Sequence, residues 1–169
     1  LLVISVFTVL NVYSYQKSQQ VTLGYHDVIE RNAALIFKVY AADIELSRQS
    51  ALLQQYLMSG NDQHRQEFEE SKVNMEAVFA SLDRDLITAE GKAGLAKVRQ
   101  VVDGWHLSAM QIIKQRSQSP TALTAASTAD LMQLVKVAEQ EIDAFQRFLR
   151  SRMHQRTEDN ARVMDATQT

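Results

Sequence analysis

The sequence has no cysteine and very little proline or glycine. Without cysteine it can hold neither a disulfide framework nor a thiolate metal site, a composition that fits both the cytosol and a bacterial periplasm. Its 169 residues include 5 glycines and 1 proline, so the turn-forming residues that sheet proteins need are scarce and long helices with few turns are favoured. No charge of one sign dominates either. The net charge is -2 with scattered lysines and arginines, so no nucleic-acid partner is predicted.

The chain does contain enough apolar residues for one packed domain, with or without a stalk. Hydrophobic residues make up 46% and charged residues 22% of the sequence, which is typical of a globular protein. Apolar side chains recur every three or four residues, and no segment alternates with the period of two that marks a strand. We therefore predict an all-α fold, an up-down-up-down antiparallel four-helix bundle. The expected helices are about 14–58, 62–86, 89–117 and 122–168.

Apolar seams of these helices define the expected core. In the first seam, nine of eleven positions are apolar or aromatic, and the sequence between them is mostly polar. Its members are Val21, Tyr25, Val28, Asn32, Leu35, Val39, Ala42, Leu46, Gln49, Leu53 and Tyr56. The seams of the other helices are Phe68, Met75, Phe79, Leu82 and Leu86; then Leu95, Val98, Val102, Trp105, Ala109 and Ile112; then Leu131, Val135, Ala138, Ile142, Phe145 and Leu149.

Local chemistry predicts where the helices end. Gly60 suits the left-handed position after the first helix, and Asn61 or Asp62 can cap the second. Thr88 is expected to cap the third helix, and Pro120 to end it and open the fourth.

The first and last helices are expected to be much longer than the inner pair. At 1.5 Å per residue they should overhang the inner helices by roughly 25 to 30 Å, toward a membrane. A two-helix stalk buries little surface alone, so a parallel homodimer is expected.

Residues 1–13, LLVISVFTVLNVY, are almost purely apolar but too short to span a bilayer. We interpret them as the outer end of a truncated transmembrane helix, with Tyr13, Tyr15 and Lys17 at the membrane interface and the chain as a piece of a larger protein. The alternative is a buried N-terminal core helix. In the transmembrane interpretation, residues 14–169 form the four-helix domain outside the bilayer.

Two groups of residues are candidates for ligand binding. Trp105 and His106 follow Gly104, which weakens a helix and so indicates a packing or binding requirement; the alternative for Trp105 is a place in the core. Asn32 and Gln49 interrupt the first seam, either to control helix register or to contact a polar ligand.

Arg48 completes the set, as a solvent-facing charge or as a bidentate contact to a carboxylate ligand. The four histidines lack the Glu-x-x-His pairs of a metal bundle, and no nucleophile or phosphate loop is recognisable. No metal, cofactor or enzymatic activity is predicted for this chain.

The stretch YLMSGNDQHRQEFEESKVNMEAVFASLDRDL resembles the third type of CHASE sensory domain, whose first long helix closes on the pattern seen at residues 56–61. The resemblance covers about residues 26–115. It implies a periplasmic four-helix domain between two transmembrane helices of a bacterial inner-membrane receptor, most often a sensor histidine kinase. Its stimulus would be an unknown small molecule or protein.

The chain resembles the ligand domain of methyl-accepting chemoreceptors to nearly the same degree. A diguanylate cyclase can carry the same kind of input domain. Two other classes stay open, a cytosolic structural bundle and a metal-dependent bundle enzyme.

Overall fold

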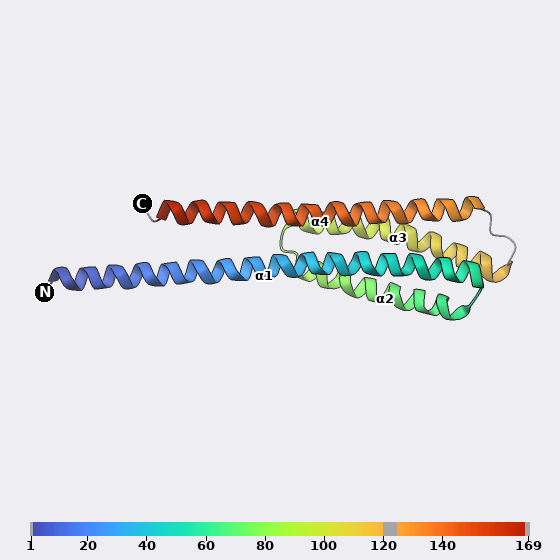
Figure 1. Cartoon of the computed structure of the whole chain (residues 1–169), viewed down its shortest axis with the longest axis horizontal. Helices are drawn as coiled ribbons and strands as arrows, with labels where there is room; N and C mark the ends of the chain where they lie inside the picture. The colour runs from blue at the N-terminus through green and yellow to red at the C-terminus, as the bar shows by residue number, and fades with distance from the viewer. Residues whose placement is uncertain (1, 120–124, 168–169) are drawn as a thin grey trace. The chain divides into compact units, whose positions relative to one another are not determined.

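The computed structural model describes the backbone of residues 2–119 and 125–167, and the side-chain surroundings of residues 30, 32–119, 128–159 and 162. The described backbone contains four helices and no strand (Figure 1). They are α1 (Leu2–Ser59), α2 (Asp62–Asp85), α3 (Ala89–Gln118) and α4 (Ala125–Thr167). The all-α, four-helix prediction is confirmed. The first and last helices are the long ones, with 58 and 43 residues against 24 and 30.

The helix ends follow the predicted capping chemistry. Gly60 has a φ of 69°, in the left-handed region that glycine enters without a steric penalty. The Asn61 side chain caps α2 by accepting a hydrogen bond from the second residue of that helix at 3.0 Å. Thr88 caps α3 in the same way, accepting from the Gly91 N–H at 3.1 Å. The predicted role of Pro120 lies outside the described residues.

The chain forms two compact units, to which α1 and α4 both contribute. Residues 35–151 make up the first, here called the bundle unit, in which consecutive helices run antiparallel (Figure 1). Residues 1–34 and 152–169 make up the second, the terminal unit.

The bundle unit is organised around one apolar core that all four helices share. Every predicted seam residue from Leu35 onward is buried there, because the apolar stripe of each helix is excluded from water only on the inner side. Asn32 is half-buried in the terminal unit, and Val21, Tyr25 and Val28 lie outside the described side chains.

Polar side chains join neighbouring helices around the outside of this core. There is a contact between α1 and α2, α2 and α3, α3 and α4, and α4 and α1, so the helices follow one another in cyclic order. The contacts are Lys38 with Asp85, Arg99 with Glu76 at 3.4 Å, Lys97 with Glu141 at 3.0 Å, and Arg150 with the Tyr40 hydroxyl. Partly exposed pairs of this kind each contribute about 0–1 kcal/mol, so the apolar core supplies most of the stability.

The apolar N-terminal run is the first part of α1. The surroundings of its side chains lie outside the described ones, so its predicted location at a membrane stays a prediction. Within residues 2–119 and 125–167, no helix combines the length and the apolar composition needed to cross a bilayer.

Candidate functional site

A polar pair lies in the middle of the apolar core. Gln49 of α1 is 0% exposed and His106 of α3 is 2% exposed, and 2.7 Å separates Gln49 Oε1 from His106 Nε2. An amide oxygen only accepts hydrogen bonds, so in this arrangement His106 Nε2 carries the proton and donates it. The ring is then the tautomer whose Nδ1 is a bare acceptor. The pair connects α1 to α3. The neighbours of Gln49 in the α1 seam, Leu46 and Leu53, are both apolar and buried.

Several polar atoms around this pair have no hydrogen-bond partner among the described residues. They are Gln49 Nε2, His106 Nδ1 and Trp105 Nε1, all buried. We call Gln49, Trp105 and His106 the polar core cluster. A buried donor or acceptor without a partner costs about 1–3 kcal/mol, so this level of the bundle is packed less favourably than an apolar layer.

Aromatic rings enclose the polar core cluster. Phe68 of α2 lies 5.7 Å from the Trp105 ring and 6.3 Å from the His106 ring, both in edge-to-face geometry. Trp105 and His106 are themselves 5.0 Å apart between ring centres. Such contacts stabilise the rings by about 0.5–1.5 kcal/mol per aromatic pair. Three helices therefore meet at this level.

The cluster holds its histidine in the neutral form. Burial lowers the pKa of His106 from 6.5 to about 4, and the positive charge of Lys72 acts in the same direction. Near pH 7 the ring is a hydrogen-bonding group and not a cation, so it is unsuited to holding an anionic ligand by charge.

The structure brings three of the five predicted site residues together. Trp105, His106 and Gln49 form the cluster, and Trp105 is in the core as its alternative interpretation required. Arg48 immediately precedes Gln49 in α1 but is exposed, because one residue turns a helix by about 100° and places the two side chains on different faces. Asn32 belongs to the terminal unit.

No packing contact among the described residues requires a glycine at position 104, so of the two predicted reasons only a binding requirement stays a prediction. Gly104 is exposed, and a Cβ built there meets nothing within 4 Å. The glycine with a close neighbour is Gly94, where a Cβ would lie 2.8 Å from the ring of Phe145. Both are ordinary helical glycines in the sequence, so only the three-dimensional contacts distinguish them.

A second buried polar contact escaped the sequence reasoning. Ser71 of α2 is 0% exposed and donates a hydrogen bond to the carboxylate of Glu45 on α1. Its position on the seam between Phe68 and Met75 was the available signal. A serine at a seam position does not by itself reveal its polar partner, because the partner lies on another helix.

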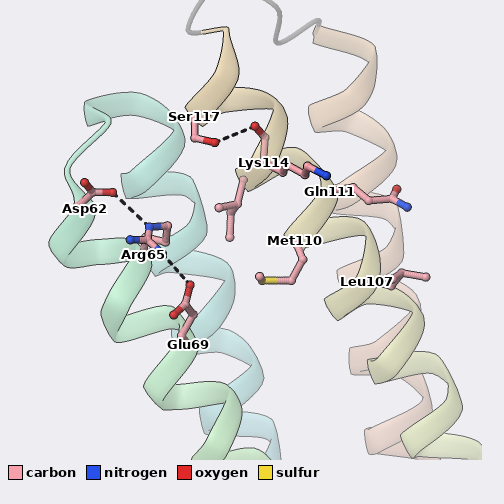
Figure 2. A pocket seen from close by; sticks show the side chains of 9 residues that line it. Asp62, Arg65, Glu69, Leu107, Met110, Gln111, Lys114 and Ser117 are labelled. Carbon is pink, nitrogen blue, oxygen red and sulfur yellow. Dashed lines mark hydrogen bonds and ion pairs between the residues drawn. The ribbon is translucent and has the colours of Figure 1, made fainter.

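An open groove of about 520 Å³ lies between the first part of α2 and the last part of α3 (Figure 2). Its apolar surface includes Leu107, which is 65% exposed, and Met110 at 37%. On the α2 side, Arg65 is held between Asp62 at 3.2 Å and Glu69 at 2.9 Å, as the dashed lines in Figure 2 show. The remaining lining residues are Gln111, Ile113, Lys114 and Ser117.

The groove is suited to an amphipathic partner, since an apolar floor lies between charged groups. Leu107 directly follows His106 in α3, so the groove and the polar core cluster lie on adjacent faces of the same helical turn. The sequence showed Leu107 and Met110 only as apolar residues off the seam; the groove depends on how α2 packs against α3.

Comparisons with known proteins give no relative for this chain. No protein-family model, no curated protein and no solved structure matches it. The resemblance to the third type of CHASE domain therefore stays a prediction.

Proposed function

We propose that this chain is the extracytoplasmic input domain of a bacterial transmembrane receptor in the inner membrane, most simply a sensor histidine kinase. A chemoreceptor and a diguanylate cyclase are alternative forms of the same proposal, which differ only in the output module. The observation that carries it is that α1 and α4, the longest helices, both contribute to the bundle unit and to the terminal unit. A continuous helix is a stiff rod that passes a displacement along its length.

The polar core cluster supplies the adjustable element of this proposal. Its unpaired polar atoms leave the packing of α1 against α3 less strongly determined than an apolar layer. A stimulus that binds one arrangement of the helices more tightly shifts the population toward that arrangement. The groove beside Leu107 is where we expect the stimulus, because a push on this turn of α3 acts directly on His106 and through it on Gln49.

Fractionation of the natural protein that carries this chain tests the proposal. The account predicts that an antibody to the bundle unit detects the protein in the membrane pellet after washing with alkaline carbonate, which removes peripheral proteins. Recovery in the soluble fraction would instead support the cytosolic structural bundle. A carbonate-resistant inner-membrane protein and a cytosolic marker serve as controls in the same lysate.

A further inference from the structure

The outer face of α1 carries a regular stripe of exposed apolar residues. Phe37 is 72%, Ile44 66% and Met58 85% exposed, and Ala51 between them is exposed as well. These four residues, here called the outer stripe, are seven positions apart and all belong to the bundle unit. The core seam occupies the opposite side of the helix, so the outer stripe faces away from the described parts of the other three helices.

A seven-residue repeat of apolar side chains is the pattern with which one helix pairs along another. The outer stripe occupies one of the two positions of such a repeat. Ser47, which is exposed, belongs to the other, as does Tyr40, which is 40% exposed and accepts a hydrogen bond from Arg150 of α4 within the same copy. A second copy of the chain presents the same stripe with the same spacing. Two copies can therefore cover each other about a two-fold axis.

Charged groups beside the stripe determine the direction of pairing. Asp43 and Arg48 lie on its two flanks, five residues apart, and neither forms an ion pair with another described residue. In a parallel pair in register, flanking residues five apart face each other across the interface, so Asp43 of one copy meets Arg48 of the other, twice. An antiparallel pair brings equivalent flanks together and loses this match. Within one copy, burial raises the pKa of Asp43 and the negative charge of Asp143 acts in the same direction, so a cation from a second copy suits this carboxylate.

We propose that two copies of this chain pair in parallel through the outer stripe of α1, with Asp43 of each copy bound to Arg48 of the other. This pairing names the partner and the interface of the homodimer. Its role in signalling rests on the proposed function. It assigns Arg48 to a protein interface. Because α1 also carries Gln49, a change at the polar core cluster is passed to the dimer interface one residue away.

Disulfide trapping tests the face directly, since the chain has no cysteine of its own. In a parallel pair, Ala51 lies close to Ala51 of the other copy, within the Cα separation of about 4.4–6.8 Å that a disulfide needs. Ala51→Cys is expected to form a covalent dimer under mild oxidation at least about tenfold faster than Ala144→Cys, an exposed position on α4. Equal rates of disulfide formation in both variants would show that Ala51 meets its counterpart only by random collision, which would overturn the proposal.

Charge exchange tests the direction. Arg48→Asp places two carboxylates across the interface and is expected to lower the association constant by about tenfold, measured by sedimentation of the purified chain. Adding Asp43→Arg restores opposite charges and should recover most of the loss, while Ile44→Lys should abolish association. Circular dichroism verifies that each variant is folded.

Each outcome has one meaning. If the association constant is unchanged by the charge exchange, or if the disulfide forms faster at Ala144→Cys than at Ala51→Cys, the dimer pairs by another face and the proposal is refuted. A chain that stays monomeric at all concentrations also refutes it and leaves the outer stripe to a different protein. None of these results bears on the carbonate fractionation, so failure of the dimer face and failure of the receptor proposal are told apart.

Discussion

Replacing the buried histidine should change how stability depends on pH. The unfolded chain binds a proton at His106 near pH 6.5, whereas the folded chain binds it only near pH 4. Between these values the unfolded state holds more protons, so the free energy of unfolding falls as the pH is lowered from 6.5 to about 4. At 1.36 kcal/mol per pKa unit, this group alone removes about 3 kcal/mol over that window. Above pH 6.5 it has no further effect.

The assay is urea unfolding of the wild type and of His106→Gln at pH 7 and pH 4. Carboxylates titrate in both proteins and cancel in the comparison, so the wild type should lose about 3 kcal/mol more than the variant between the two pH values. His154→Gln, at an exposed ring on α4, controls for the removal of a histidine as such. If wild type and His106→Gln lose stability equally, within about 1 kcal/mol, His106 is not buried in its neutral form and the description of the polar core cluster is wrong.

Three further predictions concern the stability of the bundle, measured by chemical denaturation. Gly104→Ala should raise the free energy of unfolding by about 1 kcal/mol, because the added Cβ meets nothing. Gly94→Ala should lower it by about 1 kcal/mol or more, because the added Cβ collides with the Phe145 ring. Changes of equal sign in the two variants would contradict the described packing. Thr88→Ala removes the cap of α3 and should cost about 1 kcal/mol, and an unchanged midpoint would show that the cap is dispensable. Gly60→Ala forces a side chain into the left-handed region and should cost about 1–2 kcal/mol, which a neutral result would refute.

Helices and caps could be predicted from the sequence because their signals are local. The spacing of Leu35, Val39 and Ala42 states which side of α1 faces inward, and the Asn61 side chain caps α2 with no help from distant residues. Each conclusion needs only a few consecutive residues.

The contacts between helices could not be predicted in this way. Gln49 was visible as a break in its seam, but its partner His106 is 57 residues away and depends on the rotation of α3 about its axis. The outer stripe was present in the sequence as a second apolar repeat on α1. It became meaningful only when the structure showed which side of the helix the bundle covers.

The central claim, that the bundle unit lies outside the cytoplasm, can be measured with two single-cysteine variants of α3 in the natural protein. Ala96 is exposed and Ala109 is fully buried, so Ala96→Cys reports location and Ala109→Cys reports whether the domain is folded. The account predicts that a membrane-impermeant maleimide labels Ala96→Cys in intact cells with a permeable outer membrane, and labels Ala109→Cys only after denaturation. Labelling of Ala96→Cys only after the inner membrane is broken would contradict it.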